Sequence, residues 1–280
     1  MTIRLILTLA VLSTLTAGCG GLINNKKEVE IGRGVDVEIE KEYAIVAEED
    51  PVAVWARELL VPLSEASTPF RDPKDIGGYK VEVLADDALV NAFAAPGGYT
   101  YLSTGLILSA DTCAEITGVV GHELAHVTQR HSVQSMEAAF AGQQLAQLFL
   151  GDGLASDAAQ TVWAFLNSTQ FSQLHESEAD EVGLQISHDA GYNPHGLADF
   201  FGKILALEKE GGSPPKFLSS HPATADRILA VEASIADHYG DEVVKGQTQS
   251  YACKGTKLQL EAVKKHILSG EMKVRAGTGN

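Results

Sequence analysis

The motif His122-Glu-Leu-Ala-His126 constrains this chain more than any other feature of its sequence. An α-helix turns by about 100° per residue, so His122 and His126 lie roughly 40° apart on one helical face. Both imidazoles can therefore reach one zinc ion, and Glu123 lies close enough to reach a zinc-bound water without being a ligand. Zinc lowers the pKa of such a water to about 7, and Glu123 would pass its proton to a leaving amine.

The residues before this motif favour a buried helix. The run from Glu115 to Gly121 is apolar and rich in small residues, and Thr112 with Glu115 forms a capping box for the helix start. The alternative is an exposed helix with coincidental histidines. A buried helix does not carry two histidines and a glutamate without partners for them, so we expect a zinc site here.

A second acidic segment supplies candidates for the third ligand that catalytic zinc usually needs. In His175-Glu-Ser-Glu-Ala-Asp180, Glu176 and Asp180 are four residues apart and share one helical face. Glu176 is the expected ligand, and Asp180 the expected acceptor for the distal N–H of a ligating histidine. Glu178 is the rival ligand by proximity, but it lies off this face. On its own, the segment also fits an acidic solvated helix.

Taken together, these motifs resemble those of the Ste24/HtpX-like zinc metallopeptidases, a gluzincin group. The resemblance extends over residues 26 to 236 with its parts in order, through three further segments: Glu28-Val-Glu-Ile-Gly-Arg33, the run from Asn91 to Leu106, and Ser220-His-Pro-Ala-Thr-Ala-Asp-Arg-Ile228. It implies an α+β, mostly helical, zincin-like domain with a small β-sheet packed near the zinc helix. It also implies a zinc endopeptidase with one Zn²⁺ per chain.

Hydrophobic periodicity predicts where the sheet and the helices lie. Alternation predicts a strand over 79–85, and two more flank the turn Pro96-Gly-Gly98 at 93–95 and 99–103. Helices are predicted over 26–47, 51–66, 113–131, 133–150, 156–168, 172–190, 195–210 and 222–238. In related proteases an edge strand pairs with the substrate backbone. The candidate edge here is Asn91, Ala92, Phe93, Ala94 and Ala95, and the alternative is an ordinary core strand.

The resemblance further implies that the late His-Pro element approaches the active site. We hypothesise that His221 can take the fourth position on zinc and latch the enzyme; the alternative is stabilisation of the tetrahedral oxyanion. Arg227 could pair with Asp180 or Glu176, or bind substrate carbonyls. His131, nine residues after His122, would lie about 180° around a continuous helix and is not expected to be a ligand.

The beginning of the sequence is typical of an exported protein. Arg4 precedes an apolar core too short to span a bilayer, so residues 1–18 are predicted to be a signal peptide. Thr16-Ala-Gly-Cys19 resembles a bacterial lipobox, which predicts lipidation of Cys19, a tether over 19–25, and a position on the periplasmic side of the outer membrane. The alternative is an ordinary cleaved signal and a soluble periplasmic protein.

We expect the metallopeptidase domain to span 26–240 and a C-terminal extension to span 241–280. From Val243 onward the extension has seven basic residues against two acidic ones, which fits either a docking tail or a solvated helix around 260–267 followed by a loose end. Cys113 and Cys253 are either a disulfide in an oxidising compartment or two free thiols. The formal net charge of −16 argues against a nucleic-acid partner.

Three functions are compatible with this sequence. The first is a zinc endopeptidase that hydrolyses misfolded or unassembled outer-membrane proteins, with the β-barrel assembly machinery as a further partner. The second is a chaperone-like assembly factor whose protease is latched. The third, a non-proteolytic zinc hydrolase, fits less well because a strand beside a zinc helix suits extended peptides.

Overall fold

The computed structural model describes residues 21–140, 156–209, 215–222, 225–246 and 253–275. The expected signal peptide and Cys19 lie outside these residues. Within the described ranges, no helix combines the length and the apolar character needed to cross a bilayer. The chain forms, in order, α1 (Asn25–Glu42), α2 (Pro51–Ala66), η1 (Pro73–Ile76), β1 (Lys80–Leu84), β2 (Ala92–Ala95), η2 (Pro96–Gly98), β3 (Tyr99–Ser103), α3 (Thr104–Ser109), α4 (Cys113–Thr128), α5 (His131–Ala139), α7 (Ser156–Ser168), α8 (Gln173–Asp189), α9 (Gly196–Lys209), α10 (Lys216–Ser220), α11 (Ala225–Gly246) and α12 (Leu260–Leu268).

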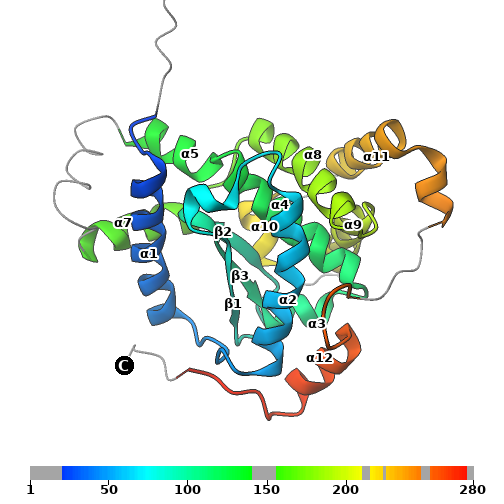
Figure 1. The fold of residues 1–280 in the computed structure, drawn as a ribbon, viewed down its shortest axis with the longest axis horizontal. Helices are drawn as coiled ribbons and strands as arrows, with labels where there is room; N and C mark the ends of the chain where they lie inside the picture. The colour runs from blue at the N-terminus through cyan, green and yellow to red at the C-terminus, as the bar shows by residue number, and fades with distance from the viewer. Residues whose placement is uncertain (1–20, 141–155, 210–214, 223–224, 247–252, 276–280) are drawn as a thin grey trace, which may run out of the picture.

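The predicted α+β class is confirmed: helices surround one three-stranded sheet (Figure 1). The strand order is β1-β3-β2, with β1 parallel and β2 antiparallel to β3. The strand β2 therefore lies at an edge. The turn between β2 and β3 needs glycine, because Gly97 has φ +75° and an added Cβ would lie 2.8 Å from the Cα of Val29.

Helix α4 runs through the centre of the molecule, and all of its residues from Cys113 to Thr128 are buried. Thr112 caps it by accepting a hydrogen bond from the N–H of Glu115 at 3.2 Å, while Glu115 accepts one from Asp111. The helix packs against α8, α9 and β2. A helix without a solvent-facing side can hold polar side chains only where other elements supply partners.

The structure corrects the expected boundary at the end of this helix. The sequence predicts one helix over 113–131, but α4 ends at Thr128 and α5 begins at His131. Between them, Arg130 takes the left-handed conformation with φ +60°. Neither glycine nor proline marks this break, so the sequence carries no local signal for it.

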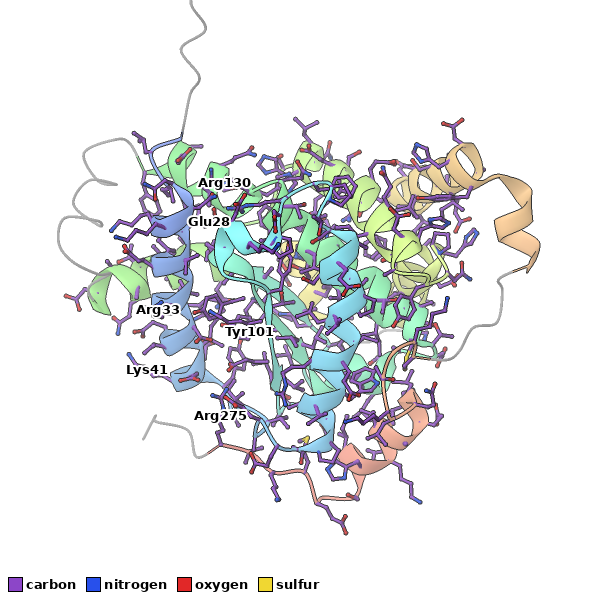
Figure 2. All side chains as sticks on the ribbon, viewed as in Figure 1. Glu28, Arg33, Lys41, Tyr101, Arg130 and Arg275 are labelled. Carbon is purple, nitrogen blue, oxygen red and sulfur yellow. A yellow bond between two sulfur atoms is a disulfide. The ribbon has the colours of Figure 1, made fainter. Side chains whose placement is uncertain are left out.

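A buried carboxylate joins four segments near this break. Nη1 and Nη2 of Arg71 each donate to one carboxylate oxygen of Glu28 at 2.9 Å, and the Nε of Arg130 donates to Glu28 at 3.0 Å. The backbone N–H of Gly97 completes the set. Figure 2 shows Glu28 on α1 pointing toward Arg130. This cluster fastens α1 to the sheet turn and to the end of α4.

The described part of the C-terminal extension belongs to the core, contrary to the expected solvated helix and loose end. Leu260, Val263 and Ile267 of α12 are buried against α2 and α3. Arg275 pairs with Glu40 and Glu82 (Figure 2). The i, i+3, i+7 spacing of the three apolar residues was the signal for this packing, and the net charge of the segment obscured it.

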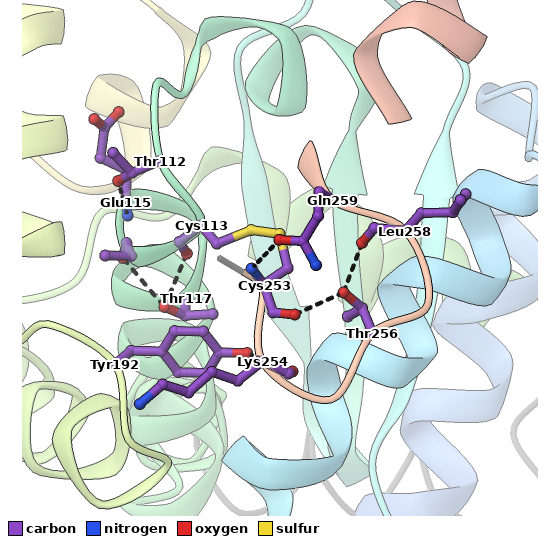
Figure 3. Close-up of a disulfide and its surroundings, with 11 residues drawn as sticks. Thr112, Cys113, Glu115, Thr117, Tyr192, Cys253, Lys254, Thr256, Leu258 and Gln259 are labelled. Carbon is purple, nitrogen blue, oxygen red and sulfur yellow. Dashed lines mark hydrogen bonds between the residues drawn. A yellow bond between two sulfur atoms is a disulfide. The ribbon is translucent and has the colours of Figure 1, made fainter. Parts of the chain in front are cut away.

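A disulfide joins Cys113 at the start of α4 to Cys253, which is one of the two alternatives considered from the sequence (Figure 3). Both residues are buried, and their Cα atoms lie 5.3 Å apart. The N–H of Cys253 also donates to the side chain of Gln259. The bridge thus ties the segment before α12 to the helix that carries the zinc motif.

Candidate active site

Four side chains from three segments converge beside α4. The Nε2 atoms of His122 and His126 lie 3.0 Å apart. Helix α8 places the carboxylate of Glu176 at 3.6 Å from the first and 3.5 Å from the second. His221, directly after α10, places its Nδ1 3.2 Å from His122 and 3.0 Å from Glu176. All four side chains are buried, and one donor atom from each lies within 4.8 Å of the others.

These residues fit a zinc ion. Three imidazole nitrogens and one carboxylate are a typical zinc donor set. Tetrahedral zinc with bonds of 2.0–2.1 Å spaces its donors about 3.4 Å apart, close to the separations of 3.0–3.6 Å found here. Facing lone pairs at such distances repel unless a proton or a cation lies between them. A zinc ion between them would remove this repulsion, so the donor set fits the metal.

Burial and neighbouring charges hold His126 and Glu176 in metal-binding protonation states. Burial lowers the pKa of His126 well below its ordinary value, so the ring stays neutral and its lone pair is available. Burial opposes ionisation of Glu176, but His221, His122 and Arg227 outweigh this effect and lower its pKa to about 2. The carboxylate is thus ionised at any physiological pH.

Asp180 and Arg227 contact the donors from the side away from the cluster's centre. Oδ1 of Asp180 lies 3.0 Å from Nδ1 of His122, which leaves Nε2 of that ring facing the cluster. Arg227 donates to both oxygens of Asp180, at 2.8 and 2.6 Å, and its Nη1 lies 2.7 Å from Glu176. The structure therefore brings together every residue that the sequence places at or behind the metal.

Glu123 lies between the donor cluster and the sheet edge. Burial raises its pKa, the effect expected to make a carboxylate a better proton acceptor near neutral pH. The backbone N–H of Ala94 on β2 donates to it. Its Oε1 has no hydrogen-bond partner in the described part of the chain and lies 3.4 Å from Nε2 of His221. A carboxylate oxygen that can accept a proton therefore lies beside an edge strand.

A narrow cavity of about 50 Å³ opens at this edge. Its lining includes Phe93 and Ala94 of β2, Glu123, Phe171 and His221. A larger groove of about 680 Å³ lies between α2 and β1, but it contains none of the metal donors. We therefore assign the chemistry to the smaller cavity and not to the larger one.

Close contact between two glycines sets the distance between α4 and α8. A Cβ added to Gly121 would lie 2.8 Å from the carbonyl oxygen of Gly183, and one added to Gly183 would lie 2.7 Å from the backbone of His122. Atoms do not approach this closely, so a side chain at either position must push the helices apart. The glycines thus let α8 present Glu176 and Asp180 to α4.

We expect Gly183→Ala to cost about 1–3 kcal/mol in free energy of unfolding, because it overpacks a close helix crossing. It should also weaken zinc binding, because α8 carries Glu176 away from the histidines. Denaturant midpoints and zinc titration measure both effects. The control is Gly202→Ala on α9, where an added Cβ meets no atom within 4 Å. If the two variants behave alike, the close packing of α4 against α8 does not determine the geometry of the donor cluster.

Comparisons with known proteins agree with this geometry. The model of peptidase family M48 matches residues 57–235. The beta-barrel assembly-enhancing protease of Escherichia coli (strain K12) is 27% identical over 208 residues, which cover 70% of this chain and 42% of that protein. The metalloprotease LoiP of the same strain is 33% identical over 155 residues, covering 53% and 59%. The mitochondrial metalloendopeptidase OMA1 of Arabidopsis thaliana is 32% identical over 164 residues, covering 57% and 33%.

These matches limit what can be transferred. The chain spans less than half the length of the beta-barrel assembly-enhancing proteases from Escherichia coli and Yersinia pestis. The family match, in contrast, covers more than half of this chain and includes all four donors, Glu123, Asp180 and Arg227. The chain therefore belongs to peptidase family M48, a family of zinc metallopeptidases.

Proposed function

We propose that this protein is a zinc-dependent endopeptidase of the bacterial cell envelope that hydrolyses misfolded or unassembled outer-membrane proteins. The observation that carries the proposal is the buried donor cluster with Glu123 between it and an edge strand. The names of the beta-barrel assembly-enhancing proteases support the substrate class. In this proposal Cys19 carries a lipid anchor, the metallopeptidase domain spans 26–240, and the β-barrel assembly machinery is a partner.

His122, His126 and Glu176 would hold the metal. Zinc supplies a Lewis acid that polarises a carbonyl and makes water a nucleophile near neutral pH. Glu123 accepts the proton of the attacking water at its free Oε1 and returns it to the leaving amine. Residues Asn91 to Ala95 align the substrate as an added strand, which demands an extended backbone and little sequence specificity. Such a site suits unfolded chains.

The proposal is tested with an outer-membrane β-barrel protein offered unfolded or folded in detergent, and with unfolded casein as a non-barrel control. We expect the zinc-loaded protein to cleave the unfolded barrel, to spare the folded one, and to lose activity when zinc is chelated. Equal cleavage of casein would contradict the proposed preference for outer-membrane proteins but not the proposed peptidase activity. Absence of all cleavage, with zinc bound, would contradict this proposal and favour the latched form described next.

A second candidate function is a chaperone-like assembly factor with a latched protease. The position of His221 favours it, because Nδ1 of this residue belongs to the donor group and would fill the fourth position that a catalytic zinc keeps open. The two functions can coexist in one protein. Loss of Glu123 would destroy the cellular role of a protease but not that of a chaperone-like factor.

If His221 is a latch, His221→Ala should raise peptidase activity. With an open form populated at about 10% or less, removal of the latch gives a gain of about tenfold or more. The same variant should bind zinc more weakly, because one donor is lost. Steady-state cleavage of an unfolded substrate at saturating zinc measures the first effect. Abolished activity would instead favour a role for His221 in stabilising the oxyanion.

A further inference from the structure

His131 lies in a position that a continuous helix would not allow. The left-handed Arg130 ends α4 and turns the chain, so that His131 starts α5 with its ring directed back toward α4. The side chain is fully buried. The chain therefore uses an uncommon backbone conformation to bring a third histidine of the motif segment next to the donor cluster.

The contacts of His131 belong to a series of polar side chains that runs from His126 to Glu178 at the surface. Its Nδ1 lies 2.9 Å from Nδ1 of His126, and its Nε2 lies 3.2 Å from a carboxylate oxygen of Glu178. The ring stacks on His175, with centroids 4.3 Å apart and planes 13° apart. Phe171 stacks on His126 at 4.0 Å. Both imidazoles are thus held in fixed planes by flat neighbours.

These contacts determine where the protons lie. His126 faces the donor cluster with Nε2, so that atom must offer a lone pair, and a neutral ring then carries its proton on Nδ1. That N–H points at Nδ1 of His131, which must accept. A neutral His131 therefore carries its proton on Nε2 and donates it to Glu178. Each ring nitrogen of His126 and His131 is thus either a donor or an acceptor.

We propose that His131 is a positioning residue for the zinc site: it fixes the tautomer and ring orientation of His126, with Glu178 fixing the tautomer of His131 in turn. Ligating histidines commonly donate their second N–H to an acceptor that orients them. Asp180 is placed to do this for His122, with its Oδ1 3.0 Å from Nδ1 of that ring. His131 does it for His126, so that each histidine of the zinc motif has its own acceptor.

The inference rests on the proposed zinc site, and its test separates the two. Zinc affinity of the full-length protein is measured by competition with a chromophoric chelator, without any peptidase assay. If the unmodified protein fails to bind zinc, the proposed function fails. If it binds zinc but His131 variants bind it equally well, only the role of His131 fails.

Two amide variants of His131 distinguish positioning from packing. The side-chain oxygen of Asn can take the place of Nδ1 and still accept from His126, whereas the oxygen of Gln reaches the place of Nε2. We expect His131→Gln to weaken zinc binding about 10–100-fold, and His131→Asn to stay within about threefold of the unmodified protein. A role in packing alone predicts similar losses for both, and that result would overturn the proposal.

A control variant and a spectroscopic measurement complete the test. His175→Phe keeps a flat ring against His131, so we expect unchanged zinc affinity. In ¹⁵N-labelled protein, His126 should show a protonated Nδ1 in the zinc-loaded state, and His131→Gln should weaken that hydrogen bond. An Nδ1 proton on His131 instead of on His126 would contradict the assignment.

Discussion

Glu123→Gln is expected to lower kcat for peptide hydrolysis by about 10²–10⁴-fold while zinc stays bound. The amide has the shape of the carboxylate but cannot accept a proton, and general-base catalysis contributes about this factor. Zinc affinity should be nearly unchanged, because Glu123 does not belong to the donor group. Cleavage of an unfolded substrate, with zinc content measured on the same sample, gives both numbers.

The control for this variant is Glu65→Gln on α2, an exposed carboxylate. It makes the same chemical change away from the donors and should leave kcat intact. Full activity in Glu123→Gln would mean that another group takes the proton, and the proposed mechanism would then be wrong. Loss of zinc together with activity would show that Glu123 supports the metal and would leave its role as base unproven.

The zinc helix was predictable because its evidence is local. His122, Glu123 and His126 follow one helical period, and the capping residues Thr112 and Glu115 lie just upstream. The edge position of 92–95 could likewise be expected from the short strands around Pro96-Gly-Gly98. In each case, a few neighbouring residues carry both the pattern and its cause.

The turn at Arg130 could not be predicted in this way. Nothing in Val127-Thr-Gln-Arg-His131 marks a break, and a non-glycine residue at φ +60° is unfavourable by itself. The conformation is supported by Glu28, 102 positions earlier in the chain, and by a hydrogen bond from Arg130 to the carbonyl of Ile23. A long-range contact thus decides whether His131 faces the zinc site.

Glu28→Ala should therefore have the largest effect on stability. Glu28 and Arg71 are only 1% and 7% exposed, so removing the carboxylate leaves a buried guanidinium charge without its partner. Loss of one member of a buried pair costs about 3–5 kcal/mol in free energy of unfolding, a large share of a typical total of about 5–15 kcal/mol. For a domain of this size, that corresponds to a fall in Tm of roughly 6–20 °C.

Thermal unfolding and zinc titration test this prediction together. Glu30→Ala on the same helix removes a carboxylate whose ion pair with Lys27 is more open to solvent, so Tm should change little. Because Glu28 also holds Arg130, the Glu28→Ala protein should bind zinc more weakly even at temperatures where it is folded. A large fall in Tm with unchanged zinc affinity would show that the turn at Arg130 persists without Glu28. The long-range link between the N-terminal helix and the zinc site would then be wrong, although the stabilising role of the cluster would stand.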